Sequence, residues 1–362
     1  MNENNNIQYQ NIEKIPIDNI YRAAFFEHPD FIPVNFVIND ACWHHYPKEW
    51  LWDLMADHKY LFPDFVRPAS DWEPNYAPVC RKDAPYRDPF GCVWITADDG
   101  ITGTVKEHPL ADWSAYGTTW QIPDPEVSDG LYPVSWSEKE KQWARTRQEK
   151  GWFFESLRHG HTFMQLCDLR GYQDLMCDMY DEEPMLDQLI DDLTQFNLSI
   201  VRRFVRNGAT LIGYPEDLGM QRGPMITHEM LNRYIQPAYK QLMQPARDAG
   251  IAIEMHSDGD IRELADDLVD SGVQILNCQD LVNGIDWIAG KYRGKVCIDL
   301  DVDRQRITPY GTPAQIDALI KREVEALATP AGGMMFTFGL YPGTPQQNVE
   351  ALMDAFERYM FL

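Results

Sequence analysis

The chain has 362 residues, 44% of them hydrophobic, and its 32 Lys and Arg against 56 Asp and Glu give a formal net charge of -24. A chain of this length and apolar content can bury a full core, so disorder is not expected. The negative charge argues against nucleic acids and anionic membrane surfaces as partners, because both would repel the protein.

Neither a membrane span nor a disulfide framework is predicted. No stretch approaches the roughly 18 apolar residues that cross a bilayer, and the polar start MNENNNIQYQNIEK lacks the basic and then apolar order of a secretory signal. The seven cysteines are odd in number and never form a C-x-x-C pair, which also argues against a zinc ribbon. We therefore expect a cytoplasmic protein with free thiols.

Residues 1 to 150 are rich in Trp, Tyr and Pro and carry many turn signals, so they predict an irregular, aromatic-lined segment. Within it, residues 31–38 (FIPVNFVI) read as a buried strand. Residues 91–96 and 102–109 read as two short strands that flank a turn at Asp98, Asp99 and Gly100.

Helices and strands alternate in the later sequence. Apolar residues at helical spacing predict a helix over 183–206, and Thr227 is a plausible N-cap for a helix that ends near residue 248. Further helices are predicted at 261–269, 287–292, 313–327 and from about Thr344. Short apolar runs predict strands at 209–214, 251–256, 273–277, 295–300 and 334–339.

This alternation predicts parallel βαβ units. At least five successive units without a Gly-rich dinucleotide fingerprint favour a (β/α)8 TIM barrel over a doubly wound sheet. We interpret residues 1–362 as a single barrel domain, in which 1–150 is an N-terminal elaboration and 151–362 forms most of the barrel.

Active sites of such barrels lie where the strands end. The polar residues near or directly after the ends of the predicted strands include Glu216, Asp217, Gln221, His256, Asp258, Cys278, Gln279, Asp299, Asp301 and Asp303. Glu216, His256 and Cys278 offer oxygen, nitrogen and sulfur ligands that suit zinc with one open position. In the alternative interpretation these acids only cap the following helices, with Asp258 at the start of helix 261–269 as the plain example.

Further roles follow from the same clustering. Asp217 and Asp258 are candidates for general acid or base catalysis, because neighbouring carboxyl groups in an enclosed mouth can have raised pKa values. Gln221 and Gln279 are predicted to bind substrate. Trp43 and Trp94 could wall a pocket for an aryl methyl ether, and the alternative, which we favour for each of them taken singly, is ordinary packing of large side chains between the N-terminal elaboration and the barrel. His159 and His161 are left open between metal ligands and ordinary surface or core histidines.

Four segments, DLGMQRGPMIT, HSDGDI, GVQILNCQD and DVDRQ, resemble the uroporphyrinogen decarboxylase superfamily, and the likeness runs from about Tyr21 to the C-terminus. The resemblance implies a (β/α)8 barrel. The superfamily contains the haem-pathway decarboxylase and also methyltransferases that work with corrinoid proteins.

The motifs favour the methyltransferase branch. The RQAGRY-like segment of the decarboxylase is absent, and Phe338 stands where that enzyme has a histidine. In the coenzyme M branch, zinc is bound by His-x-Cys and a later Cys; this chain keeps His256 but has Asp258 at the first Cys position. The sequence most resembles the substrate-side methyltransferases of corrinoid-dependent demethylation systems. This resemblance implies zinc as a cofactor and a corrinoid that is carried by a partner protein.

We therefore predict a methyltransferase that moves a methyl group from a small, methoxylated molecule to a separate corrinoid protein. A metal held by Glu216, His256 and Cys278, and a proton from Asp217 or Asp258, would assist the leaving group. The corrinoid is placed on another protein because no D-x-H-x-x-G motif is present. The alternatives are a cofactor-independent decarboxylase or lyase of a small carboxylic acid and a non-catalytic binding protein. A homodimer is left open.

Overall fold

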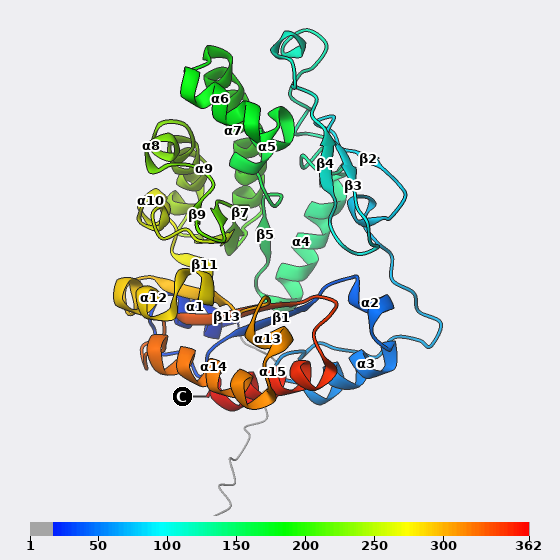
Figure 1. The fold of residues 1–362 in the computed structure, drawn as a ribbon, viewed down its shortest axis with the longest axis vertical. Coiled ribbons are helices and arrows are strands. Elements are labelled where there is room, and N and C mark those ends of the chain that lie inside the picture. Colours follow the sequence, from blue (N-terminus) through cyan, green and yellow to red (C-terminus); the bar gives the residue numbers. More distant parts are fainter. Residues whose placement is uncertain (1–16, 362) are drawn as a thin grey trace, which may run out of the picture.

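A computed structural model describes residues 17–361, and its centre is a curled parallel sheet (Figure 1). Its order is β1-β13-β12-β11-β10-β6-β5, and β7 also pairs with β10. The strands are β1 (Val34–Ile38), β5 (Phe154–Ser156), β6 (Leu211–Gly213), β7 (Glu216–Asp217), β10 (Ala252–Asp258), β11 (Ile275–Gln279), β12 (Cys297–Asp301) and β13 (Met334–Leu340). The predicted barrel class is confirmed. Within the described residues β1 and β5 do not pair, so the curled sheet is open on that side.

Helices follow the strands and cover the outer face of the sheet. They are α5 (Phe163–Arg170), α6 (Tyr172–Asp181), α7 (Pro184–Arg206), α8 (His228–Met230), α9 (Gln236–Asp248), α10 (Ala265–Ser271), α11 (Asp280–Asn283), α12 (Ile285–Tyr292), α13 (Ile307–Tyr310), α14 (Pro313–Leu327) and α15 (Gln346–Tyr359). Helix α7 packs on α9, and α14 packs on α12 and α15. Burial of their apolar faces against the sheet makes the larger of two hydrophobic core clusters.

Local capping explains several helix starts. Thr312 and Gln315 form a capping box at the start of α14, which has the predicted bounds. The predicted cap at Thr227 is confirmed, since its side chain accepts the Met230 N–H; α8 then continues through a π-helical turn (Leu231–Ile235) into α9. The helix predicted at 261–269 begins later, at Ala265. Asp258 therefore does not cap it.

The first 150 residues contain more helix than the sequence predicted. They form α1 (Ile17–Ala24), α2 (Cys42–His45), α3 (Lys48–Asp57) and α4 (Trp136–Lys150), besides β1 of the barrel. Helix α4 buries only Trp136 and Trp143, so its apolar pattern is weak. The predicted hairpin is confirmed within the small antiparallel sheet of β2 (Tyr86–Arg87), β3 (Val93–Ile95) and β4 (Thr104–Glu107).

The register of the sheet decides which residues face the barrel interior. Ser257 on β10 lies level with Glu216 on β7 and with Cys278 on β11. His256 lies level with Asn277. Since successive residues of a strand face opposite sides, these two rows face opposite ways. The first row packs against the helices, where Cys278 joins the main apolar core, and the second faces the interior.

Candidate functional site

His256 lies near the end of β10 and points into the barrel mouth. Its Nε2 is 3.6 Å from Asp217 Oδ1 and 3.5 Å from Asp258 Oδ1. Its Nδ1 is hydrogen-bonded to the side-chain oxygen of Asn277. His159 Nε2 lies 3.5 Å from the same Asp217 oxygen, and the two imidazole rings are 5.7 Å apart. Two histidines therefore share one carboxylate, and the Nε2 of His256 is the atom presented to a ligand.

A second set of contacts holds Asp258 in place beside His256. Arg304 donates to Asp258 Oδ1 at 3.0 Å and to Asp301 Oδ2 at 2.6 Å. Gln279 Nε2 also donates to Asp258 Oδ1, at 2.8 Å, and the Gln279 Oε1 accepts the Gly259 N–H at 3.0 Å. The guanidinium thus bridges two acids at the mouth, and Asp258 has a fixed position.

The charges in this cluster are interdependent. Burial by itself lowers the pKa of His256, but the Asp217 side chain and the charge of Asp258 outweigh it and raise that pKa to about 9. Burial raises the pKa of Asp217, yet hydrogen bonds with His159 and His256 lower it well below the usual range. In the metal-free protein at neutral pH, His256 is therefore an imidazolium and Asp217 is ionised. The group that carries a proton is His256, not Asp217.

Glu216, one of the three predicted metal ligands, faces away from His256. Its fully buried carboxylate accepts the backbone N–H groups of Thr162, Phe163 and Met164, at 2.6, 2.9 and 3.1 Å. These N–H groups lie at the start of α5, where a helix has no internal acceptors. Burial raises the pKa of Glu216 to about 7 despite these hydrogen bonds. The residue anchors α5 to β7.

Cys278 is also directed away from the mouth. It is buried among the apolar side chains between sheet and helices, and burial raises the pKa of its thiol. Because Glu216 and Cys278 occupy the row opposite to that of His256, the structure does not bring the predicted set of Glu216, His256 and Cys278 together. The reason is the alternation of side chains along a strand.

Two other groups of described residues around His256 have the spacing of metal ligands. One consists of His159, Asp217 and His256, and the other of His256, Asp258 and Asp301. Ligand atoms in a tetrahedral shell with bonds of about 2.1 Å are roughly 3.4 Å apart. The distances of 3.5 to 3.6 Å from the Nε2 atoms of His159 and His256 to the neighbouring carboxylate oxygens match this spacing. Imidazole and carboxylate donors at these positions fit a divalent metal such as zinc.

The remaining predicted residues have different surroundings. Gln221 is exposed in the turn between β8 (Gly219–Met220) and β9 (Gly223–Pro224), and Gln279 braces Asp258 as described above. Trp43 packs edge-on against Trp72. Trp94 is buried and donates to Asp88 Oδ2 at 2.8 Å. A substrate contact for these residues remains a prediction.

Two members of the site were not singled out from the sequence, and a third, His159, was left open between a metal ligand and an ordinary histidine. His159 follows β5, a strand that the sequence pattern did not predict. Asn277 is the interior-facing neighbour of Cys278 on β11, so a choice of the alternate residue would have found it. Arg304 lies in the DVDRQ segment, three residues after Asp301, and only its contacts reveal its part.

Glycine is required at position 259, where the loop after β10 packs against the backbone of the segment after β7. Gly259 has a φ of +82°, and a Cβ there would lie 2.1 Å from the carbonyl carbon of Gly219. We expect Gly259→Ala to lower the free energy of unfolding by about 2–4 kcal/mol, because it adds backbone strain and a clash with main chain. Urea denaturation would measure this. Gly294→Ala is the control for the φ effect alone, because its φ is +72° and a Cβ would contact nothing; an equal loss there would contradict the packing argument.

His161, which precedes α5, is fully buried, and its Nε2 has no hydrogen-bond partner in the described structure. Burial lowers its pKa to about 3. In the unfolded chain it titrates near 6.5, so below that pH the unfolded state binds more protons and stability falls. At pH 4 we expect this one residue to cost about 3 kcal/mol relative to pH 7. His161→Leu should remove this part of the loss of stability in acid, as measured by urea denaturation at several pH values. If the free energy of unfolding of the variant fell with pH as steeply as that of the unmodified protein, the argument would be contradicted.

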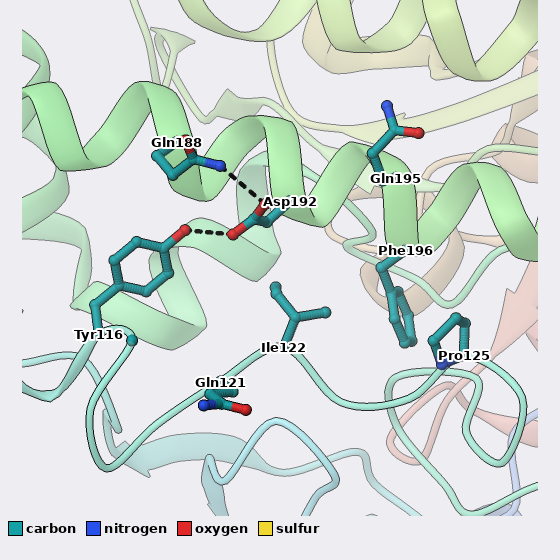
Figure 2. Close-up of a pocket in the computed structure, with 9 residues that line it drawn as sticks. Tyr116, Gln121, Ile122, Pro125, Gln188, Asp192, Gln195 and Phe196 are labelled. Atoms are coloured by element: carbon teal, nitrogen blue, oxygen red, sulfur yellow. Dashed lines mark hydrogen bonds between the residues drawn. The ribbon is translucent and has the colours of Figure 1, made fainter.

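Two cavities lie away from the His256 Nε2. One of about 590 Å³ lies between α7 and the elaboration, where the Tyr116 hydroxyl donates to Asp192 Oδ2 at 2.5 Å (Figure 2). It contains none of the predicted site residues. The other, of about 640 Å³, is lined by β1 and β5 at the open side of the sheet and reaches Glu254 and Asp299. Burial and the charge of Glu254 raise the pKa of Asp299 to about 7.

Comparison with known proteins finds a family match in the part of the chain that was predicted to form most of the barrel. Residues 161–359, more than half of the length, match the family Uroporphyrinogen decarboxylase (URO-D). The chain belongs to this family. The matched part of this URO-D member contains the strands and loops that carry His256, Asp217 and Asp258.

Two relatives from Methanosarcina mazei are named as methyltransferases, in agreement with the predicted branch of the superfamily. Methylcobamide:CoM methyltransferase MtbA is 20% identical over 183 residues, which is 51% of this chain and 52% of MtbA. The chain thus matches about half the length of this curated relative. A solved structure titled methyltransferase superposes with a TM-score of 0.64 at 16% identity and covers 96% of this chain and 99% of its own. At 16% identity, this structural similarity establishes a shared fold and nothing further.

Among residues 17–361, no helix combines the length and the apolar character needed to cross a bilayer.

Proposed function

We propose that this URO-D family member is a methyltransferase that moves a methyl group from a small molecule to a corrinoid carried by a separate protein. Three observations support the proposal: the family match, the likeness to Methylcobamide:CoM methyltransferase MtbA, and the fold shared with a methyltransferase. The sequence contains no D-x-H-x-x-G segment to ligate cobalt. The barrel mouth would then have to admit both the methyl donor and the corrinoid domain.

The observation that carries the proposal is the His256 cluster at the barrel mouth. Methyl transfer to cobalt breaks a bond and leaves negative charge on the departing atom, so a nearby proton donor lowers the barrier. The His256 imidazolium faces Asp217 and Asp258 at 3.6 and 3.5 Å. Asn277 holds the opposite ring nitrogen, so the Nε2 proton is directed into the mouth. Asp217 then stabilises the imidazolium.

The residues also fit a metal. We propose that His159, Asp217 and His256 would hold it, with Asp258 as a further neighbour, in place of Glu216 and Cys278. A bound zinc ion would act as a Lewis acid toward the leaving group, or would favour the thiolate form of a thiol substrate. In either case Asn277 orients His256 and Arg304 holds Asp258 against Asp301. Such outer contacts commonly set the tautomer and direction of metal ligands.

For the methyl donor we propose a methoxylated compound. In the metal-free protein its departing oxygen would accept the proton of His256 directly, whereas a metal held by the His256 Nε2 would take the place of that proton and would polarise the oxygen instead. Large aromatic side chains such as Trp43 lie on the rim that follows β1. An aromatic donor would gain from stacking on such side chains. Gln221, exposed in the β8–β9 turn, is free to contact it.

The decisive experiment combines metal analysis with turnover. The purified protein would be analysed for bound metal and then mixed with a Co(I) corrinoid protein and a panel of methoxylated compounds, while the cobalt absorption spectrum is followed. We expect conversion of Co(I) to methyl-Co(III) with at least one donor. Release of CO₂ from a small carboxylic acid with no change at cobalt would instead support a decarboxylase.

A further inference from the structure

A second group of histidine and carboxylate side chains lies on the rim of the barrel. His44 and His45 end α2, the short helix that follows the carboxyl end of β1. They therefore lie at the end of the barrel where the strands terminate, as His256 does. Asp98 comes from the turn between β3 and β4. Among residues 17–361, this is the one three-residue group with metal-ligand spacing that does not contain His256.

One carboxylate lies between the two imidazoles. His45 Nε2 is 2.7 Å from Asp98 Oδ2, and His44 Nε2 is 3.2 Å from Asp98 Oδ1. The ring centroids of the two histidines are 4.6 Å apart, and the three ligand atoms lie within 4.8 Å of one another. A tetrahedral shell separates its ligand atoms by roughly 3.4 Å. Small side-chain rotations would therefore place all three around one ion.

The backbone holds this arrangement without help from an ion. A Cβ at Gly100 would lie 2.2 Å from the Ala41 nitrogen, so the turn that carries Asp98 packs directly against the chain that enters α2. The Gly100 N–H donates to the Cys80 carbonyl at 2.8 Å. On the other side, the buried Cys42 thiol donates to the Leu340 carbonyl at 3.2 Å and fixes α2 to β13.

The ring of His44 has a defined direction. Its Nδ1 lies 2.9 Å from the Tyr76 hydroxyl, which leaves the Nε2 facing Asp98. A hydrogen bond to the second ring nitrogen is the usual way in which proteins orient a ligating histidine. All three ligand side chains are 35–42% exposed, so solvent or another ligand could complete the coordination. Asp40 and Asp99 lie close enough to act on Tyr76 and add negative charge.

We propose that His44, His45 and Asp98 bind one divalent transition-metal ion of the zinc type, which fastens the β3–β4 turn to the barrel rim. Two imidazoles and one carboxylate form a ligand set that zinc uses with a further open position. The bound ion would replace hydrogen bonds by metal bonds between α2 and the β3–β4 turn. It would thereby stabilise the wall of the mouth next to Trp43.

The test isolates this site from the His256 cluster. Tag-free His256→Ala protein is stripped of metal and titrated with Zn²⁺ in a calorimeter and with Co²⁺ under visible spectroscopy. We expect one ion per chain and a rise in Tm at saturating Zn²⁺. In this background, Asp98→Asn should weaken Zn²⁺ binding at least tenfold, and the pair His44→Ala and His45→Ala should abolish both binding and the rise in Tm.

His228→Ala is the matched control, because His228 is an exposed histidine 2.7 Å from a single carboxylate, that of Asp267. It should alter neither binding nor Tm. Absence of Zn²⁺ binding by the His256→Ala protein would overturn the proposal, and so would undiminished affinity after both rim histidines are replaced. Neither readout requires methyl transfer, so this outcome is independent of that of the proposed function.

Discussion

Replacement of His256 by glutamine is expected to slow methyl transfer to the corrinoid by about 10²–10⁴-fold. Glutamine keeps a polar side chain of similar reach but can neither carry the proton nor ligate a metal as imidazole does. The Nε2 that is lost is the atom near both Asp217 and Asp258. The rate would be followed by the cobalt spectrum with one donor and one corrinoid protein at fixed concentrations.

His228→Gln is the control for this variant, since it replaces an exposed histidine that lies outside the barrel mouth on α8. Its rate should match that of the unmodified protein. If His256→Gln also transferred methyl groups at full rate, the mouth cluster would not be the catalytic site. The free energy of unfolding of both variants should be measured, so that a loss of rate is not caused by unfolding.

Replacement of Glu216 by alanine is expected to lower the free energy of unfolding by about 3 kcal/mol. The variant leaves three N–H groups at the start of α5 without their acceptor, and a buried unsatisfied donor costs about 1–3 kcal/mol. Relief of the buried charge offsets part of this loss, since burial has already raised the pKa of Glu216 to about 7. Urea denaturation at pH 7 would give the value.

Glu263→Ala, at an exposed glutamate, should change the free energy of unfolding by less than about 0.5 kcal/mol and serves as the control.

A measurement of metal content distinguishes the two roles considered for Glu216, which are the anchoring of α5 and the binding of a metal. If Glu216 only anchors α5, the folded Glu216→Ala protein should keep any metal that the unmodified protein binds. A loss of metal in Glu216→Ala, with none in Asp217→Asn, would restore Glu216 as a ligand and exclude the set proposed here.

Much of the fold was accessible from the sequence because it rests on local patterns. The helices predicted over 183–206 and 313–327 depend on residues within single elements, and α7 and α14 occur at these positions. The weak apolar pattern of α4 left that helix unpredicted, since tertiary contacts of Trp136 and Trp143 support it.

The convergence of residues 217, 256 and 258 on one mouth was also predictable, because parallel strands bring their carboxyl ends together whatever the intervening helices contain. His256, Asp217 and Asp258 were named on that ground, and they do lie together. The sequence alone determined six strands of the parallel sheet, β1, β6, β10, β11, β12 and β13, and the loops that were predicted to carry the site, but it did not show β5 or β7.

The side of the sheet that each residue faces was decided only by the tertiary structure. Glu216 lies level with Ser257 rather than with His256, and Cys278 lies in the same row. Side chains alternate with a period of two, so a shift of one residue in register moves a whole row from the mouth to the helix layer. The two-residue strand β7 is too short to show its own alternation. Its register, and with it the set of residues around His256, depends on hydrogen bonds to β10 that only the folded chain forms.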